Sequence, residues 1–126
     1  MRLFFGSGNA GKQLGFAIAA SVLSFSALAQ NWPSSTVTVV VPWPPGGPSD
    51  IAARPLAKGL TQALGQPFVI DNRAGGGGNI GTAAVTRAKP DGNTLLITSS
   101  APIVINPSLY KNMNFDPLKD LAPVTN

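Results

Sequence analysis

The chain has 126 residues, nine Lys and Arg, five Asp and no Glu; its formal net charge is +4, and it contains neither His nor Cys. Without His or Cys it cannot form disulfides, zinc or copper sites of the usual ligand types, or Ser-His and Cys-His nucleophilic pairs. It has no cluster of basic residues, so its charge predicts no nucleic-acid binding. We therefore predict a ligand-binding protein rather than an enzyme, with no catalytic residue, metal ion or cofactor.

Residues 1–29 have the features of a secretory signal peptide. Arg2 and Lys12 precede a mostly apolar stretch, residues 14–28, which is short for a membrane span. The stretch ends in an Ala-Leu-Ala sequence that matches a cleavage site. We predict export from the cytoplasm with cleavage after Ala29, which leaves residues 30–126 as the folded part. The alternative interpretation is an N-terminal membrane anchor.

Residues 36–50, TVTVVVPWPPGGPSD, predict a strand, a stiff loop and a helix start. Residues 36–41 are β-branched and largely apolar on both faces, which is typical of a strand covered on both sides in a parallel sheet. The three prolines that follow restrict the backbone and remove N–H donors. Gly46 and Gly47 then allow backbone angles and close approaches that other residues do not.

A helix is predicted over residues 50–64, with Ser49 and Asp50 as suitable N-cap residues and Gly65 after its end. Pro55 lies inside this stretch, and proline is tolerated only in the first turn of a helix. We therefore expect the helix to begin late, near Ala53, or to have a distorted first turn.

The remaining elements alternate between strands and helices. Strands are predicted at Pro67–Asp71, Thr94–Thr98 and Leu121–Thr125. One helix is predicted at Ile80–Ala88, with Asn79 as its cap, and a second, short helix is predicted to begin at Pro102 and to break at Asn106–Pro107. Asn114–Asp120 is predicted to form a loop or a single turn. Strands separated by helices imply a parallel sheet with right-handed crossovers. The sequence therefore predicts an α/β fold, a parallel sheet with flanking helices.

The loops after the first three strands are predicted to lie at one edge of this sheet. Each leads into a helix N-terminus, where free N–H groups and the positive end of the helix dipole suit a carboxylate or phosphate. The residues that could serve such a site are Gly47, Ser49, Gly76 to Gly78, Asn79, Gly81, Thr82, Ser99 and Ser100. Any one loop could consist only of turns and caps, but three at one edge favour a ligand site.

Three other residues have two interpretations each. Asp50 is either a helix cap or an acceptor for a ligand ammonium or hydroxyl. Trp43 is either a pocket wall or a packing residue, and Arg73 either reaches an anion or stabilises its loop in solvent. Gly76, Gly78 and Gly81 match a dinucleotide-binding fingerprint, but the next strand ends in Thr98-Ser99 and not in the acid that would hold a ribose.

Four motifs, PWPPGGPSD, NRAGGGGNIG, PDGNTLL and INPSLY, occur in this order along the predicted folded part. Together they resemble the substrate-binding receptors of tripartite tricarboxylate transporters, the Bug family. The resemblance covers nearly all of residues 30–126. This chain has Trp43 where Phe is usual in the family, and residues 73–76 read RAGG where RPGA is usual.

The resemblance implies domain 1 of a two-domain periplasmic binding protein of type II. Such a receptor binds a small carboxylate or an amino acid between its domains and delivers it to membrane permease subunits. The ligand-binding residues it implies are Gly46, Gly47, Pro48, Ser49, Asp50, Gly78, Asn79, Gly81, Thr82, Ser99 and Ser100, with Trp43 beside them. We expect residues 30–126 to be an incomplete N-terminal ligand-binding domain, a monomer that binds weakly or not at all without the second domain. The alternatives are a periplasmic ligand sensor of a signalling system and a nucleotide-dependent enzyme domain.

Overall fold

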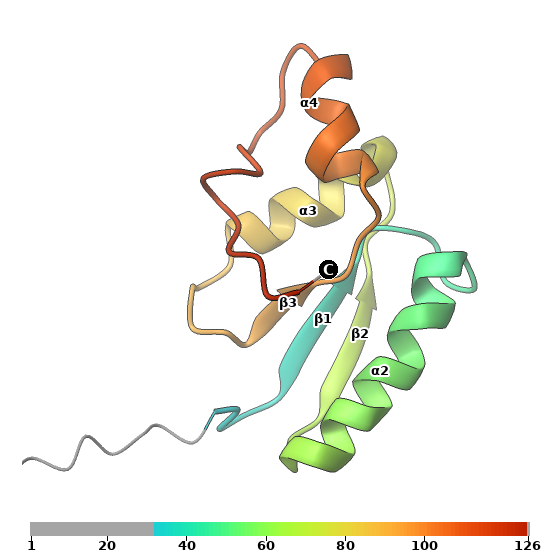
Figure 1. The fold of residues 1–126 in the computed structure, drawn as a ribbon, viewed down its shortest axis with the longest axis vertical. Coiled ribbons are helices and arrows are strands. Elements are labelled where there is room, and N and C mark those ends of the chain that lie inside the picture. The colour runs from blue at the N-terminus through green and yellow to red at the C-terminus, as the bar shows by residue number, and fades with distance from the viewer. Residues whose placement is uncertain (1–31, 126) are drawn as a thin grey trace, which may run out of the picture. The chain divides into compact units, whose positions relative to one another are not determined.

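The computed structural model describes residues 32–125, so the predicted signal peptide and its cleavage site lie outside the described residues. The elements, in chain order, are β1 (Val37–Val41), α2 (Pro48–Leu64), β2 (Phe68–Asn72), a 3-10 turn η1 (Gly76–Gly78), α3 (Asn79–Thr86), β3 (Thr94–Leu96), a π-helical turn η2 (Ala101–Ile105) and α4 (Asn106–Leu109) (Figure 1). None of these helices is long and apolar enough to cross a membrane.

The three strands form one parallel sheet in the order β2-β1-β3. Val37 pairs with Phe68 of β2, and Thr38 pairs with Thr94 of β3. β2 and β3 lie on opposite sides of β1, so right-handed connections place α2 and α3 on opposite faces of the sheet. Figure 1 shows these two helices on either side of the strands. The predicted α/β fold with a parallel sheet is therefore confirmed.

β1 is the centre of the hydrophobic core. Val37 and Val39 are at most 1% exposed and cluster with Ala57 of α2 and with Phe68. Val40, which points to the other face, is 2% exposed. Burial of one valine side chain contributes about 1.5–3 kcal/mol. This strand therefore fixes the position of the loop that follows it.

The helix α2 begins earlier than predicted. It starts at Pro48, and its N-cap is Gly47 without a side-chain cap bond, so the predicted caps at Ser49 and Asp50 are wrong. Pro48 fits because the first helical residue needs no N–H partner. Pro55 does lie inside the helix, but it is on the exposed side. Water can therefore bond the carbonyl that Pro55 leaves without a donor.

Two predictions in the last third of the described chain are wrong. The helical path does not break at Asn106–Pro107, because Pro107 falls in the first turn of α4, where its missing N–H costs little. No strand forms over Leu121–Thr125. Val124 is 84% exposed, so extension of the sheet there would gain little apolar burial, and Pro123 lacks an N–H for a ladder. The predicted turn within residues 114–120 is observed, closed by Asp120 N–H to Asp116 O at 2.8 Å.

Candidate functional site

The predicted ligand edge lies where the three strands end. The segments after β1, β2 and β3 lead into α2, α3 and η2 at that edge (Figure 1). The chain passes from β1 to β2 over one face and from β2 to β3 over the other. The strand order therefore changes direction at β1, and α/β sheets leave a crevice for ligands at such a point.

The three loops meet at Gly78. A Cβ atom on Gly78 would lie 3.3 Å from Cζ2 of Trp43, in the first loop, and 3.3 Å from Cγ of Pro102, at the start of η2. Gly78 also has a φ of +92°, which side chains rarely allow. Position 78 therefore requires glycine, and the predicted convergence of the three loops is observed.

Trp43 is the large side chain at this meeting point. Its Nε1 atom is buried without a hydrogen-bond partner, and its backbone N–H makes no hydrogen bond within residues 32–125. The Oγ1 atom of Thr98, which follows β3, is also buried without a partner. Buried polar groups without partners are uncommon and mark places where water or a ligand is expected. Trp43 therefore packs against the second loop, and its role as a pocket wall stays a prediction.

The first loop, residues 42–47, is held by the side chain of Asp50. Asp50 is 1% exposed, and its Oδ2 accepts the Gly46 N–H at 2.9 Å. Arg54 donates to both carboxylate oxygens, from Nε at 2.8 Å and from Nη2 at 3.0 Å. Asn72 donates from Nδ2 to Oδ1 at 3.0 Å. These donors, Arg54 first, lower the pKa of Asp50 to about 2, against its ordinary 3.8. The carboxylate is therefore engaged within the chain, which favours its structural interpretation.

Close packing and buried hydrogen bonds hold the second loop, residues 73–78. A Cβ atom on Gly81 would lie 2.7 Å from both the Arg73 carbonyl oxygen and Cβ of Pro42, so α3 approaches β1 at this glycine. Thr82 is fully buried, and its hydroxyl donates to the Gly78 carbonyl at 2.9 Å. In this structure Gly81 and Thr82 support the loop from inside, and their contact with a ligand stays a prediction.

Asn79 and Asn106 connect the second loop to α4. Asn79 is the first residue of α3 and not its predicted cap, since the N-cap is Gly78. Its Oδ1 accepts from Nδ2 of Asn106 at 2.7 Å, and the same nitrogen donates to the Gly77 carbonyl at 2.9 Å. Asn106 is 4% exposed. Sequence reasoning did not select Asn106 or Asn72 for the site, although both lie inside the motifs quoted above.

Three serines of the predicted set have free hydroxyls. Ser49 is half-buried at the second position of α2, whereas Ser99 and Ser100 are exposed after β3. None of the three hydroxyls makes a hydrogen bond with the described residues, and Ser100 does not cap η2 with its side chain. Gly46 is exposed, and Gly47 and Pro48 begin α2 beside it. Contact of these residues with a ligand stays a prediction.

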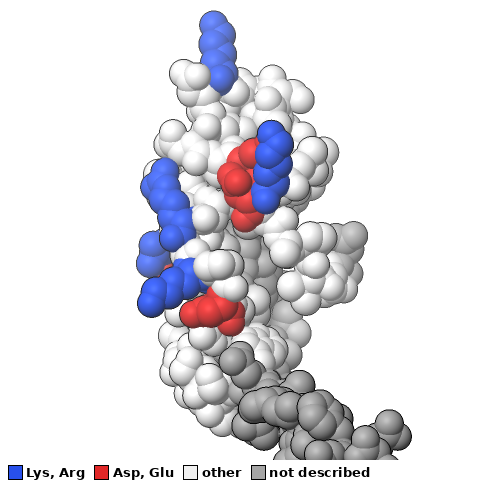
Figure 2. Space-filling model, turned by 90° about the vertical axis from the view of Figure 1, so that its left-hand side faces the viewer, with Lys and Arg blue, Asp and Glu red and all other residues white. Residues whose placement is uncertain are grey.

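The charged side chains near this edge are paired. Arg73 donates from Nε to Asp71 at 2.7 Å and is half-exposed, as expected of an arginine that stabilises its own loop. Figure 2 shows mostly uncharged side chains over one face, with the acidic groups beside basic ones. Within residues 32–125, no three carboxylates come together as metal ligands.

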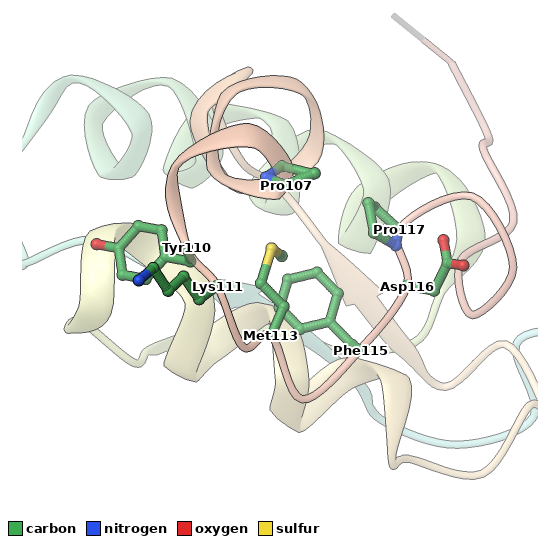
Figure 3. Close-up of a pocket in the computed structure, with 7 residues that line it drawn as sticks. All are labelled: Pro107, Tyr110, Lys111, Met113, Phe115, Asp116 and Pro117. Atoms are coloured by element: carbon green, nitrogen blue, oxygen red, sulfur yellow. The ribbon is translucent and has the colours of Figure 1, made fainter.

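Two hollows on the described surface lie away from the three loops. One, of about 330 Å³, follows α4; Figure 3 shows its lining residues, with Met113 and Phe115 at the centre and Tyr110 and Lys111 to one side. The other, of about 410 Å³, lies between α2 and β2. None of the predicted ligand-binding residues lines either hollow. The candidate site is therefore an edge of loops and helix starts and not one of these hollows.

Comparison with known proteins identifies the family. Residues 52–126 match the family model described as the tripartite tricarboxylate transporter family receptor. The chain belongs to this family. This confirms the resemblance drawn from the four motifs, and the family is one of receptors.

The relatives of this receptor chain are similar in sequence and in structure. Protein BugT of Bordetella pertussis is 42% identical over 113 residues, which are 89% of this chain and 35% of BugT. An R. palustris protein solved with adipate is 41% identical with a TM-score of 0.67, over 69% of this chain and 29% of that one. MatC from Rhodopseudomonas palustris, solved with bound malate, is 38% identical with a TM-score of 0.67, over 71% and 30%. The chain spans about a third of the length of these relatives.

Proposed function

We propose that this chain supplies one wall of the carboxylate-binding cleft of a periplasmic receptor that serves a tripartite tricarboxylate transporter. The observation that carries the proposal is the meeting of three loops at Gly78, beside the starts of α2 and α3. Helix starts attract anions because their N–H groups are free and the helix dipole is positive there. The family to which the chain belongs supports the receptor role.

The charges at this edge favour a carboxylate ligand over an amino acid. Asp50 was the carboxylate best placed for a ligand ammonium group, but Arg54, Gly46 and Asn72 already occupy its oxygens. The free hydroxyls of Ser49, Ser99 and Ser100 are instead available as donors. A surface with free hydrogen-bond donors and no free carboxylate suits an anion. The adipate and malate bound to the two R. palustris proteins are small dicarboxylates.

The remaining parts of the proposal follow from the family. A signal peptide over residues 1–29, cleaved after Ala29, would export the chain to the periplasm. The receptor would work as a monomer without catalytic activity and pass its ligand to membrane permease subunits. Because this chain spans about a third of its relatives, the opposite wall of the cleft belongs to sequence beyond the matched part in those proteins.

Isothermal titration calorimetry with malate, adipate and citrate tests the proposal. Two proteins are compared: the chain itself, and a chimera in which residues 32–125 replace the matching segment of MatC. We expect the chimera to bind a dicarboxylate, and the chain alone to bind it more weakly because one wall is missing. ATP serves as the control ligand and should not bind.

A loop variant locates the site within the chimera. Gly47→Val places a branched side chain at the start of α2, where a Cβ atom would lie 3.3 Å from the Pro44 carbonyl oxygen. It should abolish dicarboxylate binding. Gly59→Ala, in a part of α2 where a Cβ atom would meet nothing within 4 Å, is the matched control and should leave binding intact. A folded chimera that binds ATP but no carboxylate would contradict the proposal.

A further inference from the structure

Two residues outside the predicted site form hydrogen bonds with the first loop or with Asp50, the residue that holds it. Asn72, at the end of β2, donates from one nitrogen to the Trp43 carbonyl at 3.1 Å and to the Asp50 carboxylate at 3.0 Å. Arg54, one helical turn after Asp50, donates to both oxygens of that carboxylate. A chain of side-chain contacts therefore joins β2, the loop and α2.

The loop has few hydrogen bonds of its own. Pro42, Pro44 and Pro45 have no N–H, so only Trp43, Gly46 and Gly47 can donate from the backbone of residues 42–47. Gly47 donates to the Pro44 carbonyl at a long 3.2 Å, and Gly46 donates to Asp50. Gly46 has a φ of +79°, which glycine adopts without strain, so its own backbone preference does not fix the loop. The loop therefore depends on side chains from outside for its shape.

The same contacts place Trp43 against the second loop. The Trp43 carbonyl is held by Asn72, and the Trp43 ring lies on Gly78. Asn72 is followed directly by the second loop, residues 73–78. A shift of the Asn72 side chain would therefore change the separation of the two loops that form the proposed carboxylate site.

We propose that Asn72, Asp50 and Arg54 are positioning residues that hold the first loop, and with it Trp43, in the shape that binds the carboxylate. This rests on the proposed function for its consequence on affinity, but the positioning itself is a property of the chain without ligand. Asp50 acts as the hub because its buried carboxylate accepts from the loop, from β2 and from α2.

The fluorescence of Trp43 reports the position of the loop directly. The chain has two tryptophans, so Trp32→Phe leaves Trp43 as the only one. In this background, Asn72→Ala removes both bonds to Trp43 and Asp50. We expect a red shift of Trp43 emission and stronger quenching by acrylamide, with the far-ultraviolet circular dichroism unchanged.

Two further variants separate positioning from general loss of structure. Arg54→Lys keeps the charge beside Asp50 but loses the two-point contact, so it should give a smaller red shift than Asn72→Ala. Asp71→Asn removes the exposed ion pair with Arg73 at the end of the same strand, without a contact to the first loop. It should leave Trp43 emission unchanged. If Asn72→Ala does not fold, the Trp43 emission of Arg54→Lys is compared with that of Asp71→Asn. A red shift in Arg54→Lys alone supports the positioning role, and equal emission in the two variants contradicts it.

The MatC chimera provides the second readout. There, Asn72→Ala should weaken malate binding about tenfold, because the loss of bonds to a charged group and a carbonyl costs about 1.4 kcal/mol. Trp43 emission and quenching that match the parent would overturn the positioning role. An unchanged malate affinity in a chimera that binds would overturn it as well. A chimera that binds no carboxylate would instead contradict the proposed function, while the emission would still decide on positioning.

Discussion

The first loop, residues 42–47, and the second loop, residues 73–78, meet at the same edge but are held in different ways. Prolines stiffen the first loop, and a buried carboxylate, Asp50, ties it to the helix after it. The second loop contains four consecutive glycines, each with a positive φ, and packing against neighbours fixes it. The first loop is restricted by its own prolines and by hydrogen bonds from a few side chains outside it, whereas the second loop is restricted by packing and by bonds to its carbonyls.

This difference predicts how substitutions affect each loop. The glycine loop has no conformational preference of its own, so it depends on Gly81, Thr82 and Asn106 for a unique shape. Changes at those positions should affect the stability of the whole fold, because they lie in the packing between α3, β1 and α4. The proline loop should instead lose its position while the sheet remains folded.

The largest effect should come from Gly81→Ala. The added Cβ atom would lie 2.7 Å from the Arg73 carbonyl oxygen and from Pro42, neither of which can move freely. We expect a loss of about 3 kcal/mol in the free energy of unfolding, the upper end for overpacking. Urea denaturation followed by circular dichroism measures it.

Gly59→Ala is the matched control for this substitution. Gly59 is an exposed residue in the middle of α2 with nothing near its absent Cβ atom. It should stabilise the chain by about 0.5–1 kcal/mol, because alanine is the better helix former. If both substitutions stabilise, the close contact of α3 with β1 is not a constraint on the fold.

Asn106→Ala should have the next largest effect. It removes the donor to the Gly77 carbonyl and to Asn79 Oδ1, and it leaves both acceptors partly buried. We expect a loss of about 1–2 kcal/mol in the free energy of unfolding. Amide hydrogen exchange should also rise in residues 75–79. Uniform exchange across the sheet, without a local increase, would contradict the assignment of Asn106 to this loop.

A smaller loss of stability, caused by protonation of Asp50 beside the first loop, should occur only in acid. The pKa of Asp50 is about 2 in the folded chain, below its ordinary 3.8. Between these values the unfolded chain takes up a proton that the folded chain does not, so the contribution of Asp50 to stability is present above pH 4 and is lost as the pH falls toward 2.

The difference in the free energy of unfolding between the parent chain and Asp50→Asn isolates the contribution of Asp50. Asp91 and Asp116 also have lowered pKa values, from hydrogen bonds to Asn93 and Lys119, so the parent chain has several groups that respond to acid. The stability difference between parent and variant should shrink from pH 5 to pH 2. A difference that is constant over this range would show that Asp50 has the same pKa in the folded and the unfolded chain.

The smallest effect should come from Asp71→Asn. It breaks the pair with Arg73, whose side chain is 51% exposed, and exposed pairs of this kind contribute less than about 1 kcal/mol. We expect the free energy of unfolding to change by less than about 0.5 kcal/mol. A loss as large as that of Asn106→Ala would mean that the second loop is held by its surface charges.

The local sequence was sufficient to predict the strands and loops that form this edge. The β-branched run at Val37–Val41 specified a strand buried on both faces. The Pro-Gly sequence after it and the glycine run after β2 specified two loops that lead into helices. Parallel order followed from the alternation of strands and helices. From this, the meeting of the loops could be predicted without a structure.

The positioning residues could not be predicted in the same way. Asn72 bonds to Trp43, 29 residues earlier, and Asn106 bonds to Gly77, also 29 residues away. An asparagine beside a loop has the same local pattern whether it forms a turn or bridges distant segments. The late start expected for α2 was wrong for a related reason. Burial of Ala53 and Ala57 against the sheet stabilises the helix, and Pro55 lies on the side that faces water.

The central place of β1 in the sheet has a consequence for the order of events during synthesis. β1 comes first in the chain, but both of its partners come later, at Phe68–Asn72 and at Thr94–Leu96. Its apolar residues therefore leave the ribosome well before any strand can cover them. Contacts between distant segments form slowly, and exposed apolar strands aggregate. If the chain is exported as proposed, β1 stays uncovered until after export, so the chain should need a chaperone until then.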